Sequence, residues 1–525
     1  MIWRIVRKEL LENLLSLRFA LGLAVVLAMM GIVGYVLLGD YVSRWQTYIA
    51  DVQRHREELE EVKVYSTIEV TVDFPPSPLS IFSRGARDLP TSIGVSPYRV
   101  PSLMEGGTGG SAVSIHIWGT SKRPENPFLR IFNAIDLSFV VRVIFSLFAV
   151  LLVFDSFSGE REQGTLSMIM SCPVGRLEVL AGKFIGACTT MAIPLALGFL
   201  MVLILWSVSP EVEINAKTWK GGGLLFLSSL LYLAGFIALG LLVSLCVHDS
   251  SAGLMYLLLI WVVVAVVLPE GGGYLAHYAR PQDSRQQILE AAENAWEEYS
   301  GEYEKIRDQH PQKSGWWGAS TDDTGADRFI GISLEEMENR VAFNKKAYPM
   351  KFRYAEKKAR IFERYEGELR RWRQLRGHLL RASFCNLYGN IVQSIAGTGM
   401  ETYELALDGA RHYRKDLVAF LLPKVGLPEL VTRVHHYPDT QVNEENRRYW
   451  DELDAEKGKG YVQENIMNWD RMAPLDLSAL PLPRIVYPEL GARMAQARLD
   501  ILLLVAFAVL PLGLAGWRVL HYRVR

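Results

Sequence analysis

The sequence is poor in cysteine, and its few cysteines are not arranged as a site. Four occur in 525 residues, and no two have the Cys-x-x-Cys spacing of zinc or redox sites. They are Cys172, Cys188, Cys246 and Cys385. A disulfide framework and a structural zinc site are therefore not expected, and no other spacing predicts metal ligands or catalytic residues.

An excess of charge and a nucleotide-binding loop are also missing. The 56 lysines and arginines nearly balance the 57 aspartates and glutamates, so the formal net charge is −1. A nucleic-acid partner is not expected, because such binding needs a clustered excess of cations. The pattern Gly-x-x-x-x-Gly-Lys-Ser/Thr occurs nowhere. The chain is therefore expected to have no nucleotide site and no enzymatic activity of its own.

Long charge-free apolar runs are what the chain does have. Residues 19–38 are 20 residues without a charge, which as a helix measure about 30 Å, the thickness of a bilayer core. A secretory signal has a shorter apolar stretch, so we expect this segment to be retained. The remaining predicted spans are residues 137–154, 184–208, 221–245, 252–268 and 501–517. The sequence thus predicts six transmembrane helices.

Cations near the helix ends predict which side each loop occupies, because lysine and arginine favour the cytoplasmic side. The cations that set the orientation are Arg4, Arg7, Lys8, Arg18, Arg161, Arg176, Lys183, Arg518, Arg523 and Arg525. Lys217 and Lys220 lie in a short loop that this orientation places outside, so these two cations are weak evidence against it. Both termini, residues 155–183 and the tail 518–525 are then cytoplasmic, and residues 39–136 and 269–500 are extracytoplasmic.

The two outer segments predict different folds, in a chain that is mainly α overall. After the first span we expect a small α/β domain, with a polar helix over 48–62 and a strand over 64–72. The larger segment has an acidic helical pattern over 283–308 and a basic, aromatic-rich one over 345–376. The basic helix could present a surface that binds anionic polysaccharide or lipid headgroups. We favour a hairpin in which the acidic and the basic helix pack together, because the apolar stripe of the basic helix needs a partner helix.

Residues 1–18 are predicted to form an amphipathic helix on the inner membrane surface. Its apolar face carries residues at helical spacing, and its polar face carries charges. The apolar positions are Ile2, Val6, Leu10, Leu14 and Leu17, opposite Arg4, Lys8 and Glu12. A simple anchor and a role in coupling are equally compatible with this pattern.

The segment after the second span predicts a helix, a break, a short helix and a second break. Gly164 permits a sharp turn, the Thr165 hydroxyl can cap the turn that follows, and Pro173 ends that short helix. The short helix is expected to lie across the cytoplasmic mouth of the bundle.

These residues resemble the type-2 ABC exporter permeases. That family has an acidic-Arg-Glu-x-Gly-Thr-Leu stretch after the second span and a Pro-x-x-Arg stretch leading to Gly-Lys before the third. Here these are residues 160–166, 173–176 and 182–183. The insertions after spans one and five resemble the subgroup labelled as permeases for multicopper-enzyme maturation.

The resemblance implies an ABC exporter subunit in a bacterial cytoplasmic membrane. It implies a second permease, identical or different, and two cytoplasmic ATPase subunits, which would hold the ATP and Mg²⁺. Membrane lipid and an extracytoplasmic protein are further expected partners. It assigns coupling to the ATPase to Glu160, Arg161, Glu162, Gly164, Thr165, Pro173 and Arg176. The alternative is a force-transmitting scaffold whose outer helical domain docks an envelope or maturation partner without moving cargo.

Arg142 stands inside the predicted second span, where a charge at the helix centre costs roughly 2.5–3.5 kcal/mol by insertion scales. It therefore needs a partner or water. Three arrangements are open: its side chain reaches outward to headgroups, it pairs with an acid such as Asp136 or Asp500, or it contacts a lipid or another anion.

Overall fold

The computed structural model of the chain describes residues 2–85, 92–98, 136–171, 174–212, 215–269, 271, 283–311, 320–321, 327–328, 334–427, 430, 444–461, 474–483 and 488–521. Six helices in these ranges are long and apolar enough to cross a membrane, which confirms the predicted number. They are Leu17–Glu60, Leu137–Glu162, Arg176–Ser207, Ala216–Cys246, Ser250–Val267 and Arg498–Leu520. The chain is a mainly helical, multi-pass membrane protein.

Four of these spans are single α-helices and two contain a π-helical stretch. The single helices are α2 (Leu17–Glu60), α8 (Arg176–Ser207), α9 (Ala216–Cys246) and α18 (Arg498–Leu520). The second span joins α4 (Leu137–Phe139), the π-helix η3 (Val140–Phe145), α5 (Ser146–Val153) and α6 (Ser158–Glu162). The fifth joins α10 (Ser250–Val262) and the π-helix η4 (Val263–Val267).

Helix α2 is much longer than a bilayer requires. Its 44 residues measure about 66 Å at 1.5 Å per residue, against about 30 Å for the hydrocarbon core. Ser16 starts it, because its hydroxyl accepts a hydrogen bond from the Phe19 amide. The polar helix that we expected separately over 48–62 is the continuation of α2.

The strand expected over 64–72 is shorter and begins later than predicted. The Thr67 amide donates to the Val64 carbonyl and closes a 3₁₀ turn, η1 (Tyr65–Thr67), in place of extended chain, and the Thr67 hydroxyl donates to the same carbonyl. Only β1 (Val70–Asp73) forms a strand, antiparallel to β2 (Ser92–Val95) with Val70 opposite Val95. This hairpin packs on α15 (Met400–Leu421) in a second hydrophobic core.

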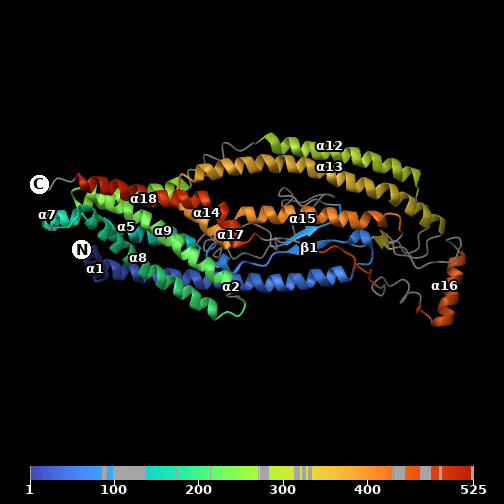
Figure 1. The fold of residues 1–525 in the computed structure, drawn as a ribbon. Coiled ribbons are helices and arrows are strands. Elements are labelled where there is room, and N and C mark those ends of the chain that lie inside the picture. Colours follow the sequence, from blue (N-terminus) through green and yellow to red (C-terminus); the bar gives the residue numbers. More distant parts are fainter. Residues whose placement is uncertain are drawn as a thin grey trace.

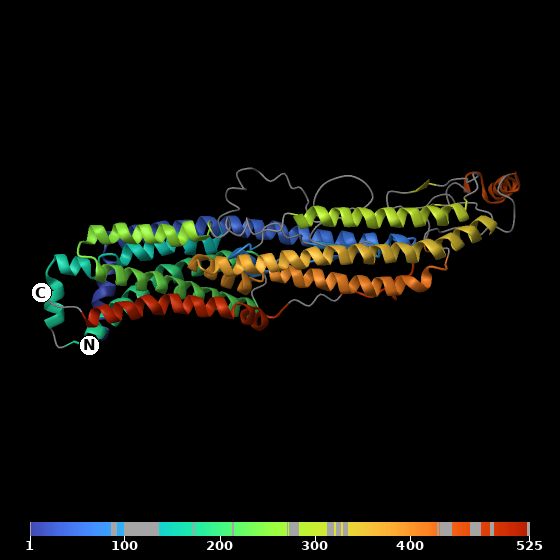
Figure 2. The ribbon, with the colours of Figure 1, turned by 90° about the horizontal axis from the view of Figure 1, so that it is seen from above.

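The molecule is elongated, with both termini at one end (Figure 1). Beyond the other end of the bundle, α12 (Asp283–Gln309), α13 (Leu334–Leu380) and α15 run in the same direction as α2, and β1 lies between α15 and α2 (Figure 1); Figure 2 shows the same extension from above. We call this extension the rod. Shorter elements are η2 (Pro78–Ile81), β3 (Ser320–Thr321), β4 (Asp327–Arg328), η5 (Leu422–Lys424), α16 (Glu444–Lys457) and α17 (Leu490–Gln496).

The predicted hairpin of an acidic and a basic helix is present as α12 and α13. Ile288 of α12 packs on Phe362 and Tyr365 of α13, and Lys357 pairs with Glu298. More ion pairs join the basic helix to a third helix, and the acid comes from α15 in two of them and from α13 in the other two. Ion pairs between α13 and α15 are Arg370–Asp408, Arg373–Glu404, Arg411–Glu366 and Arg414–Glu356. Apolar packing joins α13 to α12, and charge joins it mainly to α15.

Helix α14 (Phe384–Ala396) is an element that the sequence analysis did not predict. Its Tyr388 hydroxyl lies 2.7 Å from the Ser229 hydroxyl of α9, and its Phe384 ring stacks 3.5 Å from Phe507 of α18. The expected outer segment 269–500 therefore does not lie wholly outside the bundle of spans. At 13 residues, or about 20 Å, α14 is too short to be recognised as a span from hydropathy.

The close crossing of α9 and α18 generates a stability prediction. A Cβ at Gly235 would lie 2.4 Å from the Phe507 ring, which is held by Phe236 and Phe384. We expect Gly235→Ala to destabilise the fold by about 1–3 kcal/mol through overpacking. Gly223→Ala on the same helix is the control, since its Cβ meets nothing within 4 Å. The thermal unfolding midpoint in detergent measures both, and equal midpoints would contradict the packing described.

Candidate functional site

The segment after the second span forms a bent pair of short helices, α6 (Ser158–Glu162) and α7 (Thr165–Ser171), which we call the elbow. Gly164 joins them with φ of 72°, in the left-handed region that favours glycine. The elbow lies at the end of the molecule that carries both termini (Figure 1). The predicted helix, break and short helix are therefore present, whereas Pro173 lies outside the described residues.

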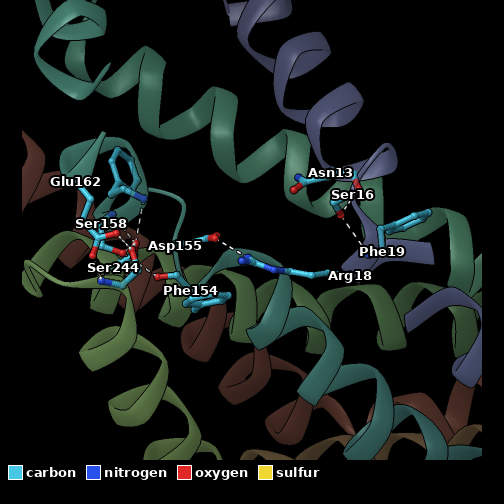
Figure 3. Close-up of polar contacts among 11 residues, drawn as sticks. Asn13, Ser16, Arg18, Phe19, Phe154, Asp155, Ser158, Glu162 and Ser244 are labelled. Carbon is cyan, nitrogen blue, oxygen red and sulfur yellow. Dashed lines mark hydrogen bonds and ion pairs between the residues drawn. The ribbon is translucent and has the colours of Figure 1, made fainter. Parts of the chain in front are cut away.

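A buried serine of α9 fixes the start of the elbow. The backbone amides of Phe157 and Ser158 donate to the Ser244 hydroxyl at 3.0 and 3.1 Å (Figure 3). These amides come at a turn after α5, where no helical carbonyl is available to them. The serine therefore ties the elbow to the end of α9.

A buried lysine joins the elbow to two other helices. The Nζ of Lys183, on α8, lies 2.7 Å from Glu9 Oε1 of α1 (Ile2–Leu14) and 2.9 Å from Glu160 Oε1 of α6. Only 2% of the Lys183 side chain is exposed, so its ammonium depends on these two carboxylates for hydrogen bonds. It also lies 5.3 Å from the centre of the Phe157 ring. One cation thus holds α1, α6 and α8 together.

Lys8 completes this charge cluster from its exposed side. Its Nζ lies 3.1 Å from the same Glu160 oxygen and 3.5 Å from Glu12. Burial lowers the Lys8 pKa, but the charge of Glu160 and the hydrogen bond to it, with Glu9 and Glu12, outweigh burial and raise it. This contribution to stability is present at neutral pH and is lost only as the pH rises through the raised pKa.

Two glycines let α1 approach α8 closely. A Cβ at Gly182 would lie 2.7 Å from Ile5, and one at Gly186 would lie 2.8 Å from the Glu9 side chain. The protein-facing side of α1 therefore includes Ile5, Val6 and Glu9. This differs from the expected apolar face, since Leu17 is exposed and belongs to α2. The glycine groove and the Lys183 ammonium select the face, not hydrophobicity alone.

Arg161 and Glu162 close the facing ends of two spans. Arg161 donates from Nη1 to the Val247 carbonyl at 2.7 Å and from Nη2 to the Leu245 carbonyl at 3.2 Å, at the end of α9. Glu162 accepts the Ser250 amide at 2.6 Å and the Ser250 hydroxyl at 3.0 Å, at the start of α10 (Figure 3). Both charges are favourable for the helix dipoles, because the Arg161 cation lies at the C-terminal end of α9 and the Glu162 anion lies at the N-terminal end of α10.

Arg176 and Thr165 also bond to backbone carbonyls. Arg176 Nη1 donates to the Leu520 carbonyl at the end of α18, at 2.8 Å. The Thr165 hydroxyl donates back to the Glu160 carbonyl at 3.2 Å. We expected this hydroxyl to cap the following turn; instead it bonds across the bend at Gly164, because the left-handed residue folds α7 back toward α6.

A separate ion pair connects the start of α2 to the same region. Arg18 Nη1 lies 2.5 Å from Asp155 Oδ2, and its guanidinium carbon lies 4.9 Å from the centre of the Phe154 ring (Figure 3). Both charged side chains are partly exposed, so the pair contributes little stability of its own. It nevertheless places the first span beside the turn that precedes the elbow.

The exposed surface of α7 carries no charge. None of the residues of α7 is charged, and Met168 is 70% exposed. The Ser167 and Ser171 hydroxyls donate to carbonyls one turn earlier in the chain. The charged side chains of the elbow are on α6 and bond to the bundle, and α7 is left uncharged.

Arg142 lies away from the elbow, in η3. Among the described residues it forms no ion pair: Asp500 binds Arg381 at 2.7 Å, and Asp136 accepts the Phe139 amide at the start of α4. Its Nε is buried without a hydrogen-bond partner. The structure thus provides neither of the acids that we considered as partners.

Sequence reasoning found the elbow but missed the residues that hold it. Lys183 was used only as an orientation cation and as part of a Gly-Lys pair, and Glu9 was not among the charges assigned to the polar face of the amphipathic helix. Ser244 and Ser250 carry no sequence signal, since a serine near the end of an apolar helix is common. Their roles depend on which helix ends meet, which spacing along the chain does not specify.

Removing the buried ammonium should cost more than removing the exposed one. Lys183→Met leaves Glu9 buried without its cation and Glu160 with only the partly exposed Lys8, for which about 3–5 kcal/mol of lost stability is expected. Lys8→Met, at a side chain that is 45% exposed, should cost under about 1 kcal/mol. Thermal unfolding of the full chain compares them. Similar losses would show that Lys183 is not the central contact.

The bend at Gly164 should tolerate asparagine better than valine. A residue with a Cβ pays about 1–2 kcal/mol in the left-handed region, and asparagine adopts it more readily than a β-branched residue. Nothing lies within 4 Å of the Cβ position, so a clash does not contribute. We expect Gly164→Val to lower the unfolding midpoint more than Gly164→Asn; the reverse order would exclude backbone strain as the reason for glycine.

Known proteins match the membrane part of the chain. A model of the family described as ABC-2 family transporter protein matches residues 3–312. A relative from Stutzerimonas stutzeri, named probable ABC transporter permease protein NosY, is 30% identical over 133 residues, 25% of this chain and 48% of that protein. The protein of the same name from Pseudomonas aeruginosa is 32% identical over 127 residues, 24% of this chain and 46% of its own.

The chain thus spans about half the length of the relatives that it matches. The family match is broader: it covers more than half of the chain and includes the elbow, the Lys183 contacts and five of the six spans. The chain therefore belongs to the ABC-2 family of transporter proteins.

Proposed function

We propose that the chain is the membrane-spanning subunit of an ABC exporter and that a separate P-loop ATPase drives it through the elbow. Family membership implies a cytoplasmic ATPase subunit as partner. The absence of a Gly-x-x-x-x-Gly-Lys-Ser/Thr loop from the sequence agrees with this division of labour. ATP and Mg²⁺ would then be held by the partner.

The arrangement of charges in the elbow carries the proposal. Glu160, Arg161 and Glu162 bond to Lys183 on α8, the end of α9 and the start of α10. A force on α7 would reach these helices through short polar contacts, without requiring α7 to touch them. Arg176 adds the end of α18. A coupling element has to pass a movement at its exposed surface to several spans, and these contacts connect the elbow and Arg176 to four helices.

The uncharged outer face of α7 is the proposed contact with the ATPase. Exposed Met168 would enter a recess of the partner, and apolar contacts would dominate there. The proposal requires the elbow and both termini on the cytoplasmic side of a bacterial inner membrane, with the rod outside. Cations beside the spans support that orientation. A second permease, identical or different, would complete the complex.

Copurification tests the function directly. The full chain, isolated from its native membrane, should retain a nucleotide-hydrolysing P-loop protein. Met168→Asp should reduce that retention and the ATP turnover of the complex, because it buries a charge, whereas Met168→Leu should preserve both. Absence of any P-loop partner, or unchanged turnover in both Met168→Asp and Glu160→Gln, would contradict the proposal.

The rod supports a second proposal, in which the chain transmits force to a partner outside the membrane and moves no cargo. α13 alone has 47 residues, about 70 Å, and α15 binds it along its length by ion pairs. A photo-crosslinker at the exposed Leu375 position separates the two functions. A stable protein adduct favours docking; adducts with lipid or solute alone favour export.

A further inference from the structure

The site around Arg142 is built from four membrane elements. η3 supplies the arginine, and α9, α10 and α14 supply polar side chains around it. Arg142 is the sixth residue of its span, about 8 Å along the helix from Leu137. A cation at this depth requires an anion or water, because the hydrocarbon offers it no hydrogen bonds.

The backbone carbonyl of Arg142, in the π-helix, accepts hydrogen bonds from two side chains. It accepts them from the Ser146 hydroxyl at 2.5 Å and from the Tyr232 hydroxyl at 2.9 Å. Trp261 of α10 in turn donates to the Ser146 hydroxyl at 2.9 Å. Three spans therefore fix the backbone that carries the guanidinium. Single π-helical turns within α-helices occur frequently at functional sites.

Aromatic and thiol groups form the wall beside this arginine. The Tyr232 hydroxyl lies 2.9 Å from the Cys385 sulfur, and the Tyr232 and Tyr388 rings stack 4.7 Å apart. The Tyr388 hydroxyl binds Ser229. These groups satisfy one another and leave the guanidinium without an acceptor. α14 therefore contributes a polar wall but no counter-charge.

The guanidinium itself has no partner among the described residues. Arg142 forms no hydrogen bond or ion pair through its side chain with the described part of the chain, and Nε is buried without an acceptor. Gly389 of α14 lies beside it, where a Cβ would be 3.6 Å from Nη1. A larger side chain at Gly389 would occupy the space next to the charge.

We propose that Arg142 binds the anionic group, a phosphate or a carboxylate, of a ligand located within the membrane. The planar guanidinium matches either group with paired hydrogen bonds, and it stays charged at any physiological pH. Asp500 and Asp136 bind other groups, so no acid in the described part of the chain supplies the counter-charge, and a bound anion would supply it. The anion belongs either to a lipid headgroup or to a transported solute, and the chemistry at Arg142 is the same for both.

Native mass spectrometry of the purified full-length complex tests the site. The complex is reconstituted in nanodiscs of phosphatidylcholine, with or without phosphatidylglycerol, and with or without palmitate. Wild type should retain phosphatidylglycerol if the anion is a lipid phosphate, or palmitate alone if it is a solute carboxylate. Arg142→Met should lower the retention at least about tenfold, as expected for loss of a charged hydrogen-bonding pair.

Two further variants separate recognition from folding. Gly389→Leu keeps the charge but fills the space beside Nη1, so it should also lower retention, while Arg142→Lys should keep part of it. Lys220→Gln removes an exposed cation of α9 and should leave retention unchanged. Equal retention of both anions by wild type, Arg142→Met and Gly389→Leu, with normal unfolding midpoints, would overturn the proposal. Binding does not require the ATPase, so this outcome is distinct from failure of the coupling.

Discussion

The end of this protein that carries both termini depends on one buried ammonium. Lys183 is nearly inaccessible, and the carboxylates of Glu9 and Glu160 lie within 3 Å of it from two other helices. The buried ammonium has no charged partners but these two carboxylates, and Glu160 has only the partly exposed Lys8 as a second cation, so the three helices are held together. The elbow is therefore not a loop resting against the spans but a part of their framework.

That constraint divides the elbow into two faces with different tasks. Its charges point inward: Arg161 binds the end of α9, and Glu162 binds the start of α10. Its outward helix, α7, has no charge and exposes Met168. The family resemblance directs attention to the acidic and basic residues as contacts with a motor. In the structure these residues bond within the chain, to α8, α9 and α10, and the helix that they leave exposed, α7, is uncharged.

Local patterns predicted the spans and the elbow well, because length, hydropathy and glycine at a bend are properties of neighbouring residues. Local patterns did not predict the contacts between residues that are far apart in the sequence. The buried face of α1 follows from Gly182 and Gly186 on another helix, and α14 is too short to be recognised as a membrane element. Thr165 shows the same limit, since its hydroxyl bonds backward only because Gly164 reverses the chain.

The claim that the elbow and α1 move as one unit is open to a distance measurement. In a cysteine-free complex, spin labels at Trp3→Cys on α1 and Ser171→Cys on α7 report their separation, and a third at Asn294→Cys on α12 reports the rod. Between the nucleotide-free and ATP-bound complex, the distance from α1 to α7 should stay constant while the distance from α7 to α12 changes. A change between α1 and α7 would contradict the account.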